Sequence, residues 1–199
     1  MPIRSLRAHR PRRGRQAAQD TAAGLAGACA VALAALACQL EPVAPPTTPL
    51  DLTASAVAQR TATLEAELER SAQPPPPRAV RVRLAFGAGA DLDLYATDRD
   101  PHSNETVYFA KHSTRAGGRL LRDARCGDPA PRTDSAIFDA VPAHGLRIGI
   151  DHHAGCAGPA ASEPFVVEIA YGEHRELRRG VARPGQFDDR FWMWSPRPD

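Results

Sequence analysis

Asp91 and Asp93 are residues whose type and spacing suit a defined chemistry, the binding of a hard metal ion. They stand two positions apart in an alternating segment, so both carboxylates project from one face of a strand. With Asp123 they provide the oxygen-rich group that Ca²⁺ prefers, although no EF-hand loop pattern is present. The alternative is structural: Asp91 caps the preceding glycine-rich turn, and Asp93 pairs with an arginine across the sheet. The sequence thus predicts a Ca²⁺ site at Asp91, Asp93 and Asp123 and leaves ordinary ion pairing open.

Tyr95, Tyr108, His152 and His153 form a second group of candidates, suited to ligand binding. The tyrosine rings can stack against a sugar or a peptide, or else fill the core and the edges of a sheet. Adjacent residues on a strand face opposite ways, so His152 and His153 can share a metal ion only in a loop. We therefore expect these four residues to contribute to a binding surface, with exposed loop histidines as the alternative.

No motif in the chain assembles a known catalytic site. Ser113 follows His112, but no Gly-x-Ser-x-Gly elbow surrounds it. The Gly87-Ala88-Gly89 segment follows a predicted strand yet lacks the third glycine and the helix that hold a dinucleotide. We therefore assign no catalytic residue and expect a protein that is not an enzyme.

Cys126 and Cys156 are the only cysteines in the second half of the chain, thirty positions apart in Gly/Pro-rich segments. In an exported protein such a pair predicts a disulfide, which for a loop of this length stabilises the fold by roughly 3 kcal/mol. Zinc ligation together with the histidines is the alternative, although the compact CxxC spacing is missing.

The amino terminus has the composition of a bacterial export signal. Six arginines lie in the first fifteen residues, and an apolar stretch ending in Ala37 precedes Cys38. The segment resembles a lipoprotein signal, in which the cysteine is lipidated and becomes the first mature residue; Cys29 is a weaker second candidate. An uncleaved anchor or a plain signal peptide remains the alternative. Loss of residues 1–37 turns the formal charge of +2 into about −3, which argues against nucleic acid as a partner.

The rest of the chain divides by composition. Prolines make residues 38–52 an extended linker, and a second run of prolines makes residues 72–78 a stiff hinge. Between them, residues 53–71 are predicted to form a helix capped by Asp51 or Thr53, with a thin apolar stripe. The hydrophobic period then changes from 3.6 to 2, and residues 79–195 contain seven or eight short alternating segments separated by turns.

These alternating segments predict the fold class. Val80, Val82, Leu84 and Phe86 alternate with arginine and alanine, as in a strand with one face on a core and one face in water. The final segment, 187–194, is apolar on both faces and is expected to lie inside a sheet or to be covered. Without βαβ spacing, the sequence predicts an all-β protein with an antiparallel sandwich of seven or eight strands, preceded by the signal segment, the linker and one short helix.

Several motifs of this domain resemble the YfaP-like domains of exported bacterial proteins. They are the stretches 90–95, 107–109, 117–123 and 144–151, which read ADLDLY, VYF, GGRLLRD and HGLRIGID. The resemblance covers about residues 79–194 and implies a β-sandwich distantly similar to the pre-peptidase C-terminal modules of secreted proteins. It also implies an accessory or binding module, and it carries over no catalytic residue.

The combined expectation is a monomeric β-sandwich tethered to the bacterial envelope through a lipid on Cys38 and located outside the cytoplasm, in the periplasm or at the cell surface. Its expected role is to bind a protein or glycan partner without catalysis. A structural lipoprotein that acts as a spacer in an envelope assembly is one alternative. A metal-dependent hydrolase that uses the Asp and His loops is the other.

Overall fold

The computed structural model describes residues 52–158 and 160–195, which contain one helix and nine strands. The predicted signal segment 1–37, the lipidation site Cys38 and the linker as far as residue 51 lie outside the described residues. The elements are α1 (Ala54–Arg70), β1 (Val80–Phe86), β2 (Ala90–Asp98), β3 (Thr106–Val107), β4 (Gly118–Arg122), β5 (Arg132–Phe138), β6 (Leu146–Gly155), β7 (Glu163–Tyr171), β8 (His174–Ala182) and β9 (Phe187–Trp194).

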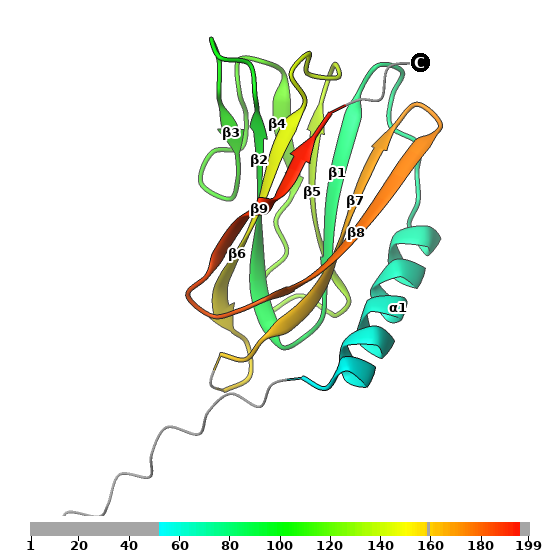
Figure 1. Ribbon diagram of the computed structural model, residues 1–199, viewed down its shortest axis with the longest axis vertical. Helices are drawn as coiled ribbons and strands as arrows, with labels where there is room; N and C mark the ends of the chain where they lie inside the picture. The colour runs from blue at the N-terminus through cyan, green and yellow to red at the C-terminus, as the bar shows by residue number, and fades with distance from the viewer. Residues whose placement is uncertain (1–51, 159, 196–199) are drawn as a thin grey trace, which may run out of the picture. The chain divides into compact units, whose positions relative to one another are not determined.

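The strands form two antiparallel sheets, which confirms the predicted sandwich (Figure 1). One sheet has five strands in the order β4-β5-β1-β7-β8, and the other has four in the order β3-β2-β6-β9. The core lies between them and is built by alternate residues of each strand: Val80, Val82, Leu84 and Phe86 of β1, Ala90, Leu92, Leu94 and Ala96 of β2, and Leu146, Ile148 and Ile150 of β6. The period of two that is visible in the sequence therefore sets the core.

The strand count exceeds the prediction by one because β4 has no alternating apolar signature. Gly117-Gly118 resembles a turn, and Gly117 does have a positive φ of 81°, but Gly118 is the first residue of β4. A Cβ at Gly118 would come within 2.7 Å of the Phe138 ring, so a close approach to the neighbouring strand requires glycine there.

Strand β9 lies at the edge of the four-stranded sheet with two exposed apolar side chains, so the expectation that it is internal or covered was wrong. The apolar side chains of this strand that the structure describes divide between the two faces of the sheet. Trp194 is buried in the core, whereas Phe187 and Met193 are 48% and 55% exposed on the other side. Hydrophobic residues on both faces of this strand reflect an exposed apolar surface rather than a covered one.

Helix α1 packs against the outer face of the five-stranded sheet. Thr53 is its N-cap, as one of the two predicted candidates, and accepts a hydrogen bond from the Ala56 N–H. Leu64 and Leu68 form a small second core with Ala85 of β1 and Val166 of β7. The face of β1 that the sequence assigned to water is therefore covered by the helix.

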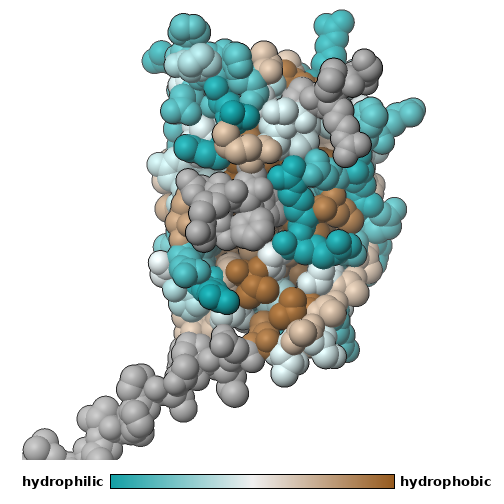
Figure 2. Space-filling view, viewed as in Figure 1, coloured by the Kyte–Doolittle hydropathy of each residue, from teal (hydrophilic) through white to brown (hydrophobic). Residues whose placement is uncertain are grey.

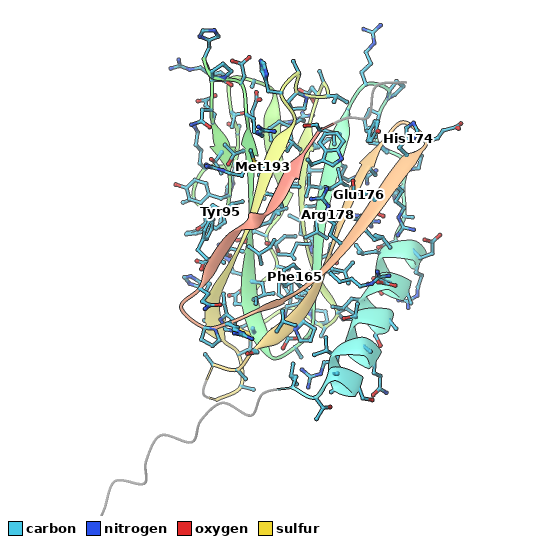
Figure 3. The ribbon with its side chains drawn as sticks, in the orientation of Figure 1. Tyr95, Phe165, His174, Glu176, Arg178 and Met193 are labelled. Atoms are coloured by element: carbon cyan, nitrogen blue, oxygen red, sulfur yellow. A yellow bond between two sulfur atoms is a disulfide. The ribbon has the colours of Figure 1, made fainter. Side chains whose placement is uncertain are left out.

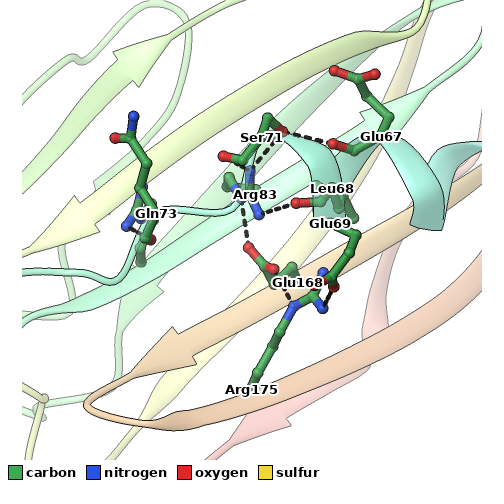
Figure 4. A network of polar contacts seen from close by, with 9 residues as sticks. Glu67, Leu68, Glu69, Ser71, Gln73, Arg83, Glu168 and Arg175 are labelled. Carbon is green, nitrogen blue, oxygen red and sulfur yellow. Dashed lines mark hydrogen bonds and ion pairs between the residues drawn. The ribbon is translucent and has the colours of Figure 1, made fainter.

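A buried ion pair lies beneath the end of the helix (Figure 4). The Arg83 guanidinium pairs with Glu168 of β7 and donates to the Leu68 carbonyl at 2.8 Å and to the Ser71 carbonyl at 3.0 Å. Arg175 of β8 bridges Glu168 to Glu69 on the helix. Arg83 thus places a positive charge and hydrogen-bond donors at the carboxyl end of α1, where unpaired carbonyls need both.

The helix leaves an apolar groove beside the edge strand β8. The groove has a volume of about 490 Å³ and is lined chiefly by small apolar residues of the first turns of α1 and by Gly180 and Val181 of β8. Figure 2 shows hydrophobic atoms gathered on the viewed face where β8 passes these turns. The covering of this sheet is therefore tight near the Arg83 network and open near the start of the helix.

Candidate functional site

The outer face of the four-stranded sheet carries the candidate residues of β2. Leu92 and Leu94 point into the core, so Asp91, Asp93 and Tyr95 project from the opposite face. Asp93 lies directly opposite Asp151 of β6, and Tyr95 lies opposite Gly149. Two carboxylates in a directly opposed pair repel each other, and such a pair destabilises a sheet unless something compensates it.

A β-bulge brings His153 to the same region. The register of β2 against β6 shifts between Asp91 and Leu92, where Leu92 pairs with His152 and Asp91 pairs with Ala154. His153 is the extra residue of β6 at this point, and its Nδ1 lies 3.8 Å from Oδ2 of Asp93. Bulges commonly redirect a side chain in this way beside a functional site.

The predicted residues Asp91, Asp93, Asp123 and His153 line one pocket of about 310 Å³, together with Phe109 and Arg125. We call this the acidic pocket. Asp123 follows β4, and Arg125 donates to its Oδ2 from Nε at 3.0 Å and from Nη2 at 2.9 Å. The structure therefore brings the three predicted carboxylates to one pocket and adds an exposed arginine to them.

Asp134 of β5 approaches the same carboxylates from the other sheet. Its Oδ1 accepts a hydrogen bond from the Ala124 N–H at 2.8 Å, and its Oδ2 accepts one from the Leu94 N–H at 3.1 Å. Asp93, Asp123 and Asp134 each offer an oxygen within 4.8 Å of the others. Asp93, Asp151 and His153 form a second group with the same spacing. Asp93 belongs to both groups and is the centre of the site.

Burial and mutual repulsion shift the titration of these groups. Desolvation, reinforced by Asp123, Asp91 and Asp151, raises the pKa of Asp93 to about 6 against the opposing charge of His153. Desolvation also raises the pKa of Asp134 to about 8, although its two backbone hydrogen bonds act in the opposite direction. Both carboxyls therefore bind protons more readily than an exposed aspartate does, and a nearby cation would oppose this effect.

The segment that carries Asp123 and Arg125 is held in place covalently. Cys126 and Cys156 form the predicted disulfide, which joins this segment to the end of β6. The buried Arg132 donates to carbonyl oxygens on both sides of the bridge, among them Ala90 at 3.1 Å and Cys126 at 2.6 Å. The acidic pocket therefore stands on a fixed loop.

An aromatic cluster borders the acidic pocket and comprises Tyr95, Tyr108, Phe109 and Phe187. Tyr95 stacks on Tyr108 with ring centroids 5.0 Å apart, and it meets Phe187 edge-on at 4.9 Å. Phe109 contacts both tyrosines and lies 6.0 Å from the His153 ring, so it joins the cluster to the pocket. Figure 3 shows Tyr95 on the flank of the sandwich away from α1. All four rings are partly exposed.

His152 does not join the binding surface predicted for it. Only 5% of the residue is exposed, and its Nε2 donates to the Ala161 carbonyl at 2.9 Å. The alternation of the strand explains this result, because His152 pairs with the inward-pointing Leu92 whereas His153 points outward. Tyr95, Tyr108 and His153 are thus brought together, and His152 is a buried structural residue.

Asp134, Phe109 and Phe187 also belong to the site, although no sequence pattern identified them as candidates, and Asp151 belongs to it after being a candidate only within the Asp and His segment of the hydrolase alternative. Asp134 carried a detectable signal, because it is in phase with Ala136 and Phe138, which point into the core. A carboxylate at an inward position of a strand demands a partner. Phe187 carried a weaker signal, as part of a strand that is apolar on both faces.

Comparison with family models, with curated proteins and with solved structures gave no match. None of the described residues belongs to a helix long and apolar enough to cross a membrane.

Proposed function

We propose that this chain is a lipid-anchored extracytoplasmic module without catalytic activity, which binds a glycan of the bacterial envelope. The observation that carries the proposal is the aromatic cluster beside the acidic pocket on the outer face of the four-stranded sheet. Binding sites of this kind combine apolar or aromatic walls with a few polar groups that fix the orientation of the ligand. The export signal and Cys38 support the location and the tether.

The chemistry of the surface favours a sugar over other ligands. The apolar face of a sugar ring can lie against an aromatic ring, while hydroxyl groups donate charge-assisted hydrogen bonds to carboxylates. Phe109 lies against both tyrosines and 6.0 Å from the His153 ring, and Nδ1 of His153 is 3.8 Å from Oδ2 of Asp93. A polyanionic ligand such as nucleic acid would be repelled by the aspartates of the pocket.

Binding can be measured with the full chain, purified in detergent from the membrane fraction of a bacterial host. We expect a glycan array to give hits, and the affinity for the best hit to fall about fivefold in Tyr108→Ala, since one aromatic contact contributes about 1 kcal/mol. Leu121→Ala is the matched control, because Leu121 is a 55% exposed apolar residue of the other sheet. The intact mass of the same preparation reports whether the chain begins at a lipidated Cys38.

Three outcomes would contradict the proposal. An equal loss of affinity in Tyr108→Ala and Leu121→Ala would remove the aromatic cluster from recognition. Hits on a peptide array and none on the glycan array would make the partner a protein. No hit on either array would favour the spacer lipoprotein.

A further inference from the structure

The carboxylates of the acidic pocket come from both sheets and meet at the flank where β5 approaches β2. Asp93 belongs to β2, Asp123 follows β4, and Asp134 belongs to β5. One oxygen of each lies within 4.8 Å of the others, the spacing at which a single ion can contact all three. Asp91 lies two positions before Asp93 on β2 and lines the same pocket. Three carboxylates from three segments therefore surround one position, and Asp91 adds a fourth to the same pocket.

Two buried oxygens of this group lack hydrogen-bond partners. Among the described residues, neither Oδ2 of Asp93 nor Oδ1 of Asp91 has one. The Asp93 side chain is 7% exposed, and the nearest cationic group, Nδ1 of His153, is 3.8 Å away, beyond hydrogen-bond length. A buried carboxylate oxygen without a hydrogen-bond donor lowers the stability of the fold. A cation bound at this position would remove that cost.

The donor set is made of oxygen alone, which selects the class of ion. Ca²⁺ accepts six to eight oxygen ligands in flexible geometry, whereas Mg²⁺ demands a near-octahedral shell and retains several waters. Asp134 is held by two backbone N–H groups, and such bonds orient a ligand without preventing it from binding metal. Both hydrogen bonds from Arg125 to Asp123 go to Oδ2. The Oδ1 atom of Asp123 can therefore face the ion.

We propose that Asp91, Asp93, Asp123 and Asp134 bind a calcium ion that ties the two sheets together beside the disulfide. Asp91, Asp93 and Asp123 were identified from the sequence as candidates, and Asp134 completes the site from the opposite sheet. The calcium site shares Asp93 with the proposed glycan surface, but calcium binding does not require a glycan, because neither Tyr95 nor Tyr108 is a ligand. Its affinity should resemble that of extracellular calcium modules, with a Kd of about 10⁻⁴ to 10⁻³ M.

The test uses the full chain in detergent, stripped with EDTA and dialysed, and titrated calorimetrically with CaCl₂. We expect one site per chain and a melting temperature that rises with CaCl₂ and rises less with MgCl₂ at equal concentration. Asp123→Asn should weaken calcium binding at least tenfold while the protein stays folded, because Asp123 lies in a loop. Asp139→Asn, an exposed carboxylate paired with Arg119, is the matched control and should bind as the parent does.

Asp93, Asp151 and His153 form the competing group, and two further variants distinguish it. Asp151→Asn and His153→Ala should leave the calcium affinity within about twofold of the parent if the ligands are those proposed. The proposal is overturned if 10 mM CaCl₂, about tenfold above the weaker expected Kd, gives neither heat nor a melting shift, or if Asp123→Asn binds calcium normally. Tight binding of ZnCl₂ that His153→Ala abolishes, without calcium binding, would assign the pocket to a transition metal. Tyr108→Ala should bind calcium normally, so failure of the glycan proposal and failure of this one are separable.

Discussion

The two outer faces of the sandwich carry polar residues at the same alternating positions, but they differ in how the charges are balanced. On the five-stranded sheet, Arg83 meets Glu168, and Arg175 extends the pairing to the helix. On the four-stranded sheet, Asp93 lies opposite Asp151 and near Asp123, with two buried oxygens unpaired. The first face is covered by α1, while the second carries the partly exposed aromatic cluster.

This contrast separates structural polarity from functional polarity. Buried charges that are paired, as Arg83 and Glu168 are, fix one arrangement and leave little to offer a ligand, although Nε of Arg81 on the same face has no hydrogen-bond partner among the described residues. Like charges held together by the backbone, a disulfide and a bulge raise the energy of the fold, and a cation or a hydrogen-bonding ligand can relieve that cost. The difference teaches that the balance of charge, rather than the number of charged residues, marks the face suited to binding.

The largest change in the free energy of unfolding should come from a substitution in the buried ion pair of the covered face. We expect Glu168→Ala to lower the free energy of unfolding by about 3 to 5 kcal/mol, because it leaves the Arg83 charge buried without its carboxylate. Urea unfolding monitored by tryptophan fluorescence and by circular dichroism measures this change. Glu176→Ala is the matched control on β8: its pair with Arg178 is partly exposed, and its loss should cost at most about 1 kcal/mol.

A second variant shows whether the charge or the packing of the covered face matters. Arg83→Met combined with Glu168→Leu removes both charges and keeps the volume, so it should recover most of the stability that Glu168→Ala loses. If the single and double variants were equally unstable, the hydrogen bonds from Arg83 to Leu68 and Ser71 would be the main contribution. If Glu168→Ala cost less than 1 kcal/mol, the ion pair would not hold the helix.

The carboxylate group around the acidic pocket and the covered face should also respond to pH in opposite directions. Burial raises the pKa of Asp134 to about 8, so the folded protein takes up a proton that the unfolded chain does not as pH falls from 8 towards 6. Stability therefore increases on acidification in that window. Burial alone would raise the pKa of Glu168, but hydrogen bonds from Arg83 and Arg175 outweigh it and lower the pKa, so its contribution is lost as pH falls below about 4.5.

Urea unfolding in EDTA at successive pH values measures both responses, and groups common to parent and variant cancel in the difference. The free energy of unfolding of the parent minus that of Asp134→Asn should fall as pH rises from 6 to 8, by at most about 1.4 kcal/mol per pH unit. Asp93 and Asp123 face Asp134 and will broaden this change. The corresponding difference between the parent and Glu168→Gln should be constant in that range and should decline only as pH falls below about 4.5. If the two differences in the free energy of unfolding changed with pH in the same way, the contrast in charge balance between the acidic pocket and the covered face would be refuted.

Local pattern was enough to predict the sandwich, and it failed where a partner from elsewhere in the chain decides the environment. The alternation of β1 identified the core positions, but Arg83 appeared solvated because α1 and Glu168 lie outside its own segment. Glu168 itself stands in an otherwise apolar strand, buried at 2% exposure, and a lone carboxylate there signals a buried counter-charge. Strand pairing and helix docking are long-range properties that no window of sequence contains.

The candidate site, like the fold, was predicted in part. Period two placed Asp91 and Asp93 on one face, and the cysteine pair was assigned correctly. The approach of Asp134 depends on where β5 crosses the flank of β2, and the separation of His152 from His153 depends on the alternation of β6 at its bulge. The packing of one sheet on the other sets the first, and spacing does not contain it. Alternation predicts that the two histidines face opposite ways, but which of them is buried depends on the register of β6 against β2.

The smallest expected effect compares one glycine of each sheet that lies against a phenylalanine ring. A Cβ at Gly180 would come within 2.3 Å of Phe165, which is 1% exposed, whereas a Cβ at Gly149 would come within 2.6 Å of Phe187, which is 48% exposed. Gly180→Ala should cost about 1 to 3 kcal/mol through overpacking of a ring that cannot move. Gly149→Ala should cost less than about 1 kcal/mol, because Phe187 can swing into solvent.

The entropy that alanine removes from the unfolded chain is the same in both glycine variants, so the difference between their urea midpoints isolates the mobility of the two rings. Gly149→Ala should also weaken glycan binding, since displacing Phe187 removes its edge contact with Tyr95, while Gly180→Ala should leave the affinity of the folded fraction unchanged. Equal losses of stability would mean that the exposed cluster is packed as rigidly as the core. The contrast between a covered structural face and an adaptable binding face would then not hold.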